Sequence, residues 1–480
     1  MAGRTGTCRP ARTGADAREL LDEVVASVDR FSDDAAPSED DSAALVITAR
    51  RPPADRPAGG RPRRVAGAAH GCRKTFPRRG IWRGAASVAR AVPRRTRARP
   101  SDDRRRIPMT DSPSARARNT LGRPFSLGGL TLRNRVVMAP MTRQFSPGGV
   151  PGPDVAEYYA RRAAAEVGLI VTEGTYVDHP SAGTSDRVPR FHGEDALAGW
   201  EKVADAVHRA GGAVMPQLWH VGMVRAAGAP PFPDAPRTGP SGIPLEGTET
   251  GRAMTRADID DVVAAFAAGA AAAEARGFDG VEIHGAHGYL VDQFLWSHTN
   301  RRTDAYGGDP ASRVRFAAEI VAACREAVSP HFPISFRTSQ WKAGHYQARL
   351  AETPDELEAV LTPLAEAGVD VFHCSTRRYW LPEFEGSDLN LAGWAKKLTG
   401  RPTITVGSVG LDNEFFAAFQ GADGGVTDIE ALLERLERDE FDLVAVGRSL
   451  LGDPEWAAKV LSGRFGDLRP FDAAGLAVLH

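Results

Sequence analysis

The sequence has little cysteine and no long apolar run, and each absence excludes a class of protein. Four cysteines in 480 residues cannot form a disulfide framework, and none has the Cys-x-x-Cys spacing of zinc or iron–sulfur sites. No run of about 18 apolar residues occurs, so we expect no transmembrane helix. We therefore predict a cytoplasmic protein, in a reducing compartment, with no metal and no membrane partner.

Net charge is also low, at −1, but this value averages two unlike segments. Residues 1–108 hold 24 Lys and Arg against 13 Asp and Glu, whereas the rest of the chain holds 36 against 48. A break of this kind usually separates a tail from a folded domain. We predict a disordered basic extension over residues 1–118 and one folded domain over residues 119–480.

The extension admits more than one interpretation. It has no apolar period that could bury enough surface to offset the cost of ordering, apart from weak helical periodicity over residues 17–28. Nucleic-acid binding by its arginines is one interpretation, but we favour a solvated tail with no nucleic-acid partner. Acidic residues clustered over 33–41 argue against a transit peptide. Met109 is a candidate start of translation, in which case the preceding text is not part of the native protein.

After residue 118 the pattern indicates an α/β fold. Two short apolar runs around Gly128 and Gly129 predict an N-terminal β-hairpin over residues 125–132. Eight apolar runs then alternate with helical patterns, as expected for parallel strands buried on both faces. The runs are residues 136–141, 168–172, 213–218, 280–283, 333–336, 369–373, 403–406 and 443–446. This arrangement predicts a (β/α)8 TIM barrel; a doubly wound sheet would need a Gly-x-Gly-x-x-Gly turn that the first strand lacks.

Polar and aromatic residues gather where these strands end, which is where a barrel carries its active site. The fourth strand is followed by His284, His287 and Tyr289, which could donate to a ligand oxygen and supply a proton. A zinc site is the competing interpretation of the two histidines, although the pattern lacks the Glu of His-Glu-x-x-His.

Other strand ends indicate a bound anion and a heterocycle. Glycines and a cation at the seventh and eighth ends predict an oxyanion site: Gly407, Ser408, Gly447 and Arg448. Arg337 would present a cation to a central ligand, unless it forms a buried ion pair with Glu173 or Glu282. Gln217 and Thr142 could hydrogen-bond a ring edge, or serve as an ordinary core contact and a helix cap.

Six segments in order resemble the old yellow enzyme family, the FMN-dependent NADH:flavin oxidoreductases or ene-reductases. The segments are NRVVMAPMTR at 134–143, YYARR at 158–162, TEGT at 172–175, QLWH at 217–220, DGVEIHGAHGY at 279–289 and NRRTDAYGG at 300–308. The resemblance covers residues 120–465. It implies FMN bound across the barrel mouth and NAD(P)H as the reductant.

The resemblance also implies roles for matching positions. Four residues would contact the flavin ring: Pro140, Thr142, Gly174 and Gln217. Arg337 would lie near flavin N1 and O2, and the oxyanion site would hold the FMN phosphate. His284 and His287 would bind the carbonyl or nitro oxygen of the substrate, and Tyr289 would be the proton donor. The implied reaction is reduction of the C=C bond of activated alkenes such as enones, maleimides and nitroalkenes.

Two other reactions and several departures from the family pattern stay open. A flavin-dependent dehydrogenase or demethylase acting on amines or enones is the same-family alternative, and a metal-dependent TIM-barrel hydrolase using the two histidines is the other. Thr142 stands where many relatives have Cys. The long loop over residues 376–394 predicts a substrate pocket lined by Trp219, Tyr379 and Trp380. A homo-oligomer is left open.

Overall fold

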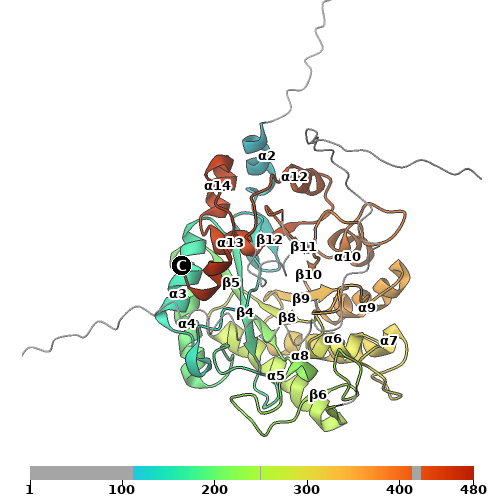
Figure 1. The fold of residues 1–480 in the computed structure, drawn as a ribbon. Helices are drawn as coiled ribbons and strands as arrows, with labels where there is room; N and C mark the ends of the chain where they lie inside the picture. The colour runs from blue at the N-terminus through green and yellow to red at the C-terminus, as the bar shows by residue number, and fades with distance from the viewer. Residues whose placement is uncertain (1–111, 249, 413–422) are drawn as a thin grey trace, which may run out of the picture. The chain divides into compact units, whose positions relative to one another are not determined.

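A computed structural model describes residues 112–248, 250–412 and 423–480, and these residues form a closed eight-stranded parallel barrel (Figure 1). The strands follow one another around the barrel in chain order, with the last pairing with the first. They are β3 (Val136–Met138), β4 (Leu169–Tyr176), β5 (Ala213–Trp219), β8 (Val281–His284), β9 (Ile334–Ser339), β10 (Val371–Ser375), β11 (Thr403–Val406) and β12 (Leu443–Val446). All eight predicted strands are confirmed, and so is the TIM-barrel fold.

Burial on both faces explains why these runs are almost wholly apolar. In β12, Leu443 and Ala445 pack with the apolar side chains inside the barrel, whereas Val444 and Val446 pack outward against the helices. Alternate residues of a strand point to opposite faces, so each strand contributes to two apolar layers. The same alternation places polar residues inside the barrel wherever they occur at the inward positions.

The predicted hairpin is confirmed by β1 (Phe125–Leu127) and β2 (Leu130–Leu132), which pair in antiparallel fashion. Gly128 at the turn has φ of 57°, a conformation that glycine adopts without strain. Leu127 and Leu132 join the interior cluster at the end where the strands begin. The hairpin therefore closes that end of the barrel and leaves the opposite end for the site.

Helices cover the outside of the barrel (Figure 1). The longer ones are α2 (Pro113–Thr120), α3 (Pro153–Ala164), α4 (Glu194–Arg209), α5 (Arg256–Ala275), α8 (Arg315–Ala327), α9 (Pro354–Ala367), α10 (Leu391–Thr399), α12 (Glu430–Glu437) and α14 (Trp456–Ser462). Shorter elements are α6 (Leu290–Leu295), α7 (Pro310–Arg313), α13 (Arg448–Gly452), η2 (Pro147–Gly149), η3 (Gly222–Val224), η4 (Phe465–Asp467), η5 (Ala473–Ala477), β6 (Thr238–Gly239) and β7 (Arg252–Ala253).

The predicted extent of disorder is wrong for residues 113–118. They belong to α2, which starts with Ser112 as N-cap and Pro113 in its first turn. Arg116 forms an ion pair with Glu437 of α12, and Ala117 is fully buried. The prediction for residues 1–111, including the periodic stretch at 17–28, lies outside the described residues.

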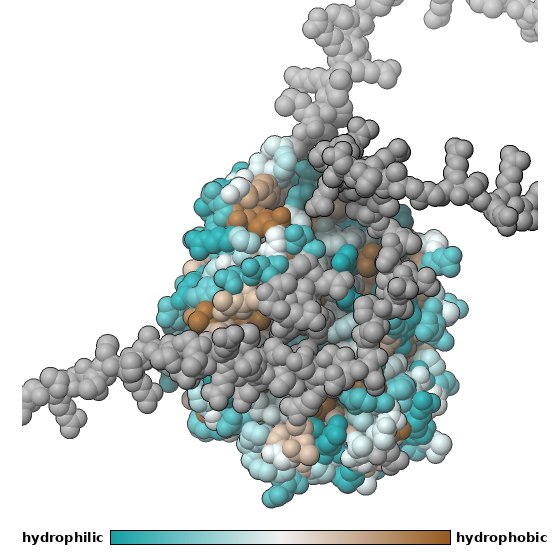
Figure 2. Space-filling view, in the orientation of Figure 1, coloured by the Kyte–Doolittle hydropathy of each residue, from teal (hydrophilic) through white to brown (hydrophobic). Residues whose placement is uncertain are grey.

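The outer surface is mostly hydrophilic on the face drawn in Figure 2, where brown is confined to small patches among the atoms that are not grey. A search of the described helices finds none that is both long and apolar enough to cross a membrane.

Candidate active site

Polar side chains form two layers inside the barrel, above the apolar interior. Strand register pairs Gln217 with Glu282 and Glu282 with Ser335, which makes the first layer. The second layer pairs His284 with Arg337 and Arg337 with His373, across β8, β9 and β10. Parallel strands bring residues of equal height side by side, so groups separated by tens of residues in sequence meet here.

Glu282 is the centre of the first layer. Its carboxylate is fully buried and accepts hydrogen bonds from Gln217 Nε2 at 2.9 Å, Ser335 Oγ at 2.8 Å and His373 Nδ1 at 2.7 Å. Burial alone would raise the pKa of this carboxyl, but the opposing effects of His373, Arg337 and Ser335 lower it to about 2. Glu282 is therefore an anion inside the barrel.

Arg337 is the buried cation of the second layer. Its Nη1 atom lies 3.3 Å and 3.1 Å from the two ring nitrogens of His373, and Nη2 lies 3.4 Å from Ser375 Oγ. Burial lowers the pKa of Arg337 to about 10, so it stays charged at neutral pH. Within the described chain it forms no direct ion pair with Glu173 or Glu282; its link to Glu282 runs through His373.

The predicted pair His284 and His287 is brought together with Tyr289 and Trp219. Ring centroids of His284 lie 5.2 Å from His287, 5.0 Å from Tyr289 and 6.0 Å from Trp219. Burial and the charge of Arg337 lower the pKa of His284 to about 3 and also lower that of His287. Both imidazoles are therefore neutral at pH 7, and each can donate one N–H.

His287 is held by contacts from several strand ends. Its φ of 64° is in the left-handed region, and its backbone N–H donates to Ser339 Oγ at 3.0 Å. The Nε2 atom lies 2.8 Å from Ser375 Oγ, and the ring lies 4.4 Å from that of Trp341. These contacts fix the imidazole in a conformation that costs backbone energy.

A buried ion pair supports the same loop from below. Lys342 Nζ lies 2.8 Å from Asp292 Oδ1, and neither side chain is exposed. The second carboxylate oxygen of Asp292 accepts the backbone N–H of Gly288 at 2.7 Å. Ala343 donates its backbone N–H to the carbonyl of His287. The pair therefore anchors the backbone between His287 and Tyr289.

Tyr289 has the properties of a proton donor at neutral pH. Its ring lies edge-on to Trp219, with centroids 4.8 Å apart. Burial raises the pKa of Tyr289 to about 12, so the phenol keeps its proton. Trp219 in turn stacks on Tyr176, which fills the space behind the site.

The first strand end is held in place by Glu173. The buried carboxylate accepts the backbone N–H groups of Arg143 at 2.8 Å and Gln144 at 3.1 Å. This positions the turn that carries Pro140 and Thr142, and Thr142 is exposed at the barrel mouth. Gly174 lies against Trp219, whose ring would be 2.6 Å from a Cβ atom at that position.

The predicted oxyanion site lies at the ends of the adjacent strands β11 and β12. A Cβ on Gly407 would lie 2.6 Å from the carbonyl oxygen of Thr376, so only glycine fits there. Ser408 follows with φ of 50°. Gly447 precedes α13, of which the buried Arg448 is the first residue. The structure thus brings all four predicted residues together, with backbone suited to close approach of an anion.

Tyr379 and Trp380 turn towards α12. The carbonyl of Trp380 accepts a hydrogen bond from Arg435 at 2.9 Å, and that of Tyr379 accepts one from Asn390 at 2.8 Å. No ring contact joins either residue to the two histidines within the described chain. The predicted loop is also shorter than expected, since residues 391–394 belong to α10. A role for Tyr379 and Trp380 in substrate binding stays a prediction.

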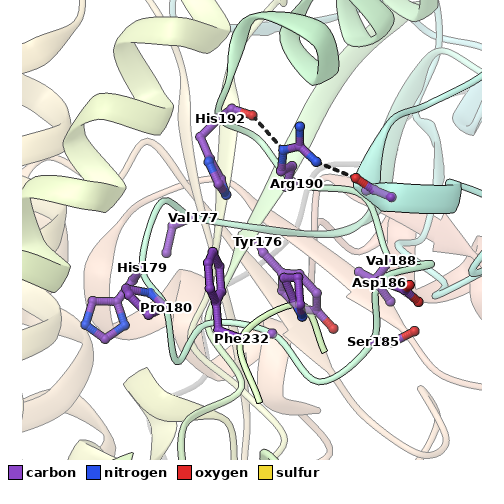
Figure 3. A pocket seen from close by; sticks show the side chains of 14 residues that line it. Tyr176, Val177, His179, Pro180, Ser185, Asp186, Val188, Arg190, His192 and Phe232 are labelled. Atoms are coloured by element: carbon purple, nitrogen blue, oxygen red, sulfur yellow. Dashed lines mark hydrogen bonds between the residues drawn. The ribbon is translucent and has the colours of Figure 1, made fainter. Parts of the chain in front are cut away.

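A separate pocket of about 160 Å³ lies behind Tyr176 (Figure 3). His179, His192 and Phe232 line it together with Tyr176. None of the predicted site residues lines this pocket, which adjoins the site through the stacking of Tyr176 on Trp219 and the backbone hydrogen bond from Val177 to Trp219.

Comparison with known proteins identifies the family. The pattern of the NADH:flavin oxidoreductase / NADH oxidase family matches residues 120–466. The chain belongs to this family. The resemblance to old yellow enzymes is therefore confirmed, and the chain is an oxidoreductase of the flavin-dependent type.

Similar proteins include enzymes of different length. An NADH oxidase of Thermoanaerobacter brockii is 34% identical over 356 residues, covering 72% of this chain but only 51% of the relative. The 12-oxophytodienoate reductase 7 of Oryza sativa subsp. japonica is 33% identical, covering 69% of this chain and 85% of the relative. The solved morphinone reductase has a TM-score of 0.62 and 29% identity, covering 74% and 92% of the two chains.

The site of this flavin oxidoreductase fits FMN. Five buried side-chain nitrogen atoms have no hydrogen-bond partner within the described chain, and three of them surround the barrel mouth: Trp219 Nε1, His284 Nδ1 and Arg337 Nε. Buried polar atoms of this kind are normally satisfied, so a polar ligand is expected here. Gly407 and Gly447 lie at the ends of neighbouring strands, where the phosphate of FMN could approach the backbone closely.

The metal interpretation lacks a ligand set. Among the described residues, no group of three or more His, Cys, Asp or Glu is arranged to hold a metal ion.

The sequence did not predict the side chains that hold the predicted site residues in position. Trp341 and Ser375 contact the predicted His287, and Ser335 donates to Glu282, which the sequence indicates only as a partner of Arg337. The sequence pattern could have indicated Glu282 and Ser375, because positions 282 and 284, and positions 373 and 375, lie on the same face of a strand. The pair of Lys342 and Asp292 had no comparable signal, because its partners come from a helix and a loop.

Proposed function

We propose that this protein is an FMN-dependent ene-reductase that uses NAD(P)H to reduce the C=C bond of activated alkenes such as enones, maleimides and nitroalkenes. One observation carries the proposal: two neutral imidazoles, one buried and one half-buried, and a protonated phenol converge beside a buried cation at one end of the barrel. The net reaction consumes NAD(P)H, one proton and the alkene, and yields NAD(P)⁺ and the saturated product.

The residues that would hold FMN come from six strand ends. Pro140, Thr142, Gly174, Gln217 and Arg337 would contact the ring, and Gly407, Ser408, Gly447 and Arg448 would hold the phosphate. When bound, FMN supplies the two-electron chemistry that links the nicotinamide to the alkene. A solved morphinone reductase in complex with tetrahydroNAD supports a nicotinamide reductant, with 29% identity and a TM-score of 0.60.

His284 and His287 would polarise the substrate. Each neutral imidazole donates one N–H, so the pair can hold one carbonyl or nitro oxygen through two hydrogen bonds. Such bonds strengthen as negative charge develops on that oxygen, and this lowers the barrier of the reaction. The contacts of His287 with Ser375 and Trp341 prevent the ring from turning away.

Tyr289 would complete the reduction by donating its proton to the substrate carbon next to the activating group. The phenol keeps this proton at neutral pH because its environment is apolar. Its edge-on packing against Trp219 and His284 holds the ring in one orientation. A positioned general acid typically contributes about 10²–10⁴-fold to a rate.

The test uses the full-length protein loaded with FMN. We expect a yellow protein absorbing near ~450 nm that NAD(P)H bleaches without oxygen, and that enones, maleimides or nitroalkenes then reoxidise in a stopped-flow experiment. Reoxidation by none of these alkenes, with amines reducing the flavin instead, would assign the same-family dehydrogenase activity. A protein that takes up no FMN would overturn the proposal.

A further inference from the structure

The carboxylate of Glu282 lies one layer below the proposed flavin site, and the family resemblance assigns it no role. It accepts hydrogen bonds from three strands at once, through Gln217, Ser335 and His373. Burying an isolated charge is costly, whereas a carboxylate with three close donors and a nearby cation is stabilised. So many buried partners on one anion indicate a function beyond packing.

The charge of Glu282 decides how Gln217 is oriented. An ionised carboxylate only accepts hydrogen bonds, so the atom of Gln217 that faces it at 2.9 Å is the amide nitrogen. The amide oxygen of Gln217 is then the atom left for a ligand, and it has no hydrogen-bond partner within the described chain. Towards the proposed FMN, Gln217 is therefore an acceptor and suits a ring N–H.

The same carboxylate fixes the protonation of His373. Nδ1 lies 2.7 Å from Glu282 and so carries the proton, while Nε2 lies 3.1 Å from the guanidinium of Arg337, which can only donate. His373 is consequently neutral. The two polar layers together then hold one anion, Glu282, and one cation, Arg337, so the positive charge that Arg337 presents to the ring is partly offset.

We infer that Glu282 is a positioning residue for the cofactor: it sets the acceptor orientation of Gln217 and, through His373, limits the positive charge that Arg337 exerts on the flavin. The inference rests on the proposed FMN site. Reduced flavin carries more negative charge than oxidised flavin, so the charge of Glu282 disfavours the reduced form. Glu282 thereby lowers the midpoint potential of the bound flavin.

The experiment compares three variants of the full-length holoprotein: Glu282→Gln, Glu282→Asp and Ser335→Ala. The ratio of the dissociation constants of oxidised and reduced FMN is obtained from anaerobic redox titration, without any alkene. Glu282→Gln should raise this ratio at least tenfold, which corresponds to about 30 mV for a two-electron couple. The amide that this substitution introduces also cannot accept from all three donors, so oxidised FMN should bind at least tenfold more weakly.

The conservative variants provide the matched controls. Glu282→Asp keeps the charge and Ser335→Ala removes one hydrogen bond without changing charge, so both should keep the ratio within threefold of the original protein. If Glu282 had a purely structural role, all three substitutions would change the ratio of the two dissociation constants by a similar factor. A Glu282→Gln protein that folds, binds FMN and keeps the original ratio would overturn the inference.

A measurement on the unaltered holoprotein covers the case in which Glu282→Gln does not fold. Nitrogen NMR of labelled histidine should show His373 protonated at Nδ1 and unprotonated at Nε2 between pH 6 and 8. With ¹⁵N3-labelled FMN, the N3 proton should be protected from exchange by the oxygen of Gln217. A charged His373, or a freely exchanging N3 proton, would overturn the inference even if alkene reduction is confirmed.

Discussion

The Nε2 atom of His287 lies 2.8 Å from the hydroxyl of Ser375, two residues that are 88 positions apart in sequence. The hydroxyl comes from the end of β10 and the histidine from the loop after β8, and these two strands are brought together because both pair with β9. The hydroxyl of Ser375 restricts rotation of the imidazole. The orientation in which His287 would meet the substrate therefore depends on a residue of another strand.

Replacing Ser375 with Ala should therefore loosen His287 without removing it. We expect phenol, a probe of the oxygen site, to bind about fivefold more weakly, since one neutral hydrogen bond contributes about 1 kcal/mol. Absorbance titration of the holoprotein measures this affinity. Ser462→Ala, an exposed change on α14, is the control and should leave the affinity unchanged. Equal affinities for both variants would show that Ser375 does not position His287.

The double variant His284→Ala with His287→Ala should abolish the long-wavelength charge-transfer band that phenols produce in this family. Both donors to the phenolate oxygen are lost, so we expect affinity to fall at least about 100-fold, in line with two charge-assisted hydrogen bonds. The band is followed in a phenol titration. His331→Ala, an exposed histidine at the opposite end of the barrel, serves as control. Persistence of the band would remove the pair from the substrate site.

Tyr289→Phe should slow alkene reduction about 10²–10⁴-fold while flavin reduction by NAD(P)H changes little, because only the alkene step needs the phenolic proton. Stopped-flow spectroscopy separates the two half-reactions. The remaining ring preserves the contact with Trp219, so folding should be unaffected. If both half-reactions slow equally, Tyr289 is not the proton donor.

Lys342→Met should destabilise the protein by about 3–5 kcal/mol, because it leaves the carboxylate of Asp292 buried without its cation. Denaturant unfolding measures the loss. Arg161→Met breaks an exposed pair with Glu157 on α3 and should cost no more than about 0.5 kcal/mol. A cost for Lys342→Met as small as that of the control would show that Asp292 finds another partner.

The titration of Glu173 should make a contribution to stability that falls as the pH rises, opposite in sign to that of the buried histidines, whose pKa values are lowered. Burial raises the pKa of this carboxyl from 4.5 to about 7, so the folded protein binds a proton there that the unfolded chain releases. The contribution is full below pH 4.5 and is lost as the pH rises through 7. It amounts to about 3 kcal/mol.

Glu173→Gln isolates this group, since an amide does not titrate. Relative to the original protein, the unfolding free energy of the variant should change between about pH 5 and pH 8 in the stabilising direction, by up to about 3 kcal/mol. Glu157→Gln, an exposed change on α3, should keep the original slope. Identical slopes for all three proteins would mean that Glu173 does not carry the pH dependence.

Much of the fold could be predicted from the chain because local rules determine it. Apolar runs mark the strands, and the side chains of Thr255 and Thr353 cap α5 and α9 by accepting the backbone N–H groups of Asp258 and Glu356. The boundary at residue 118 was wrong because α2 is polar and is held by packing against α12 and α14, which local periodicity does not reveal.

By itself, the sequence determined the strands, the barrel and the residues at the strand ends, because a strand buried on both faces is a continuous apolar run that can be recognised locally. Only the tertiary structure decided which of those residues touch. The contacts of Glu282 with His373 and of Lys342 with Asp292 join distant segments. Their protonation follows from burial and from the nearest charge, which depend on the closed barrel rather than on spacing along the chain.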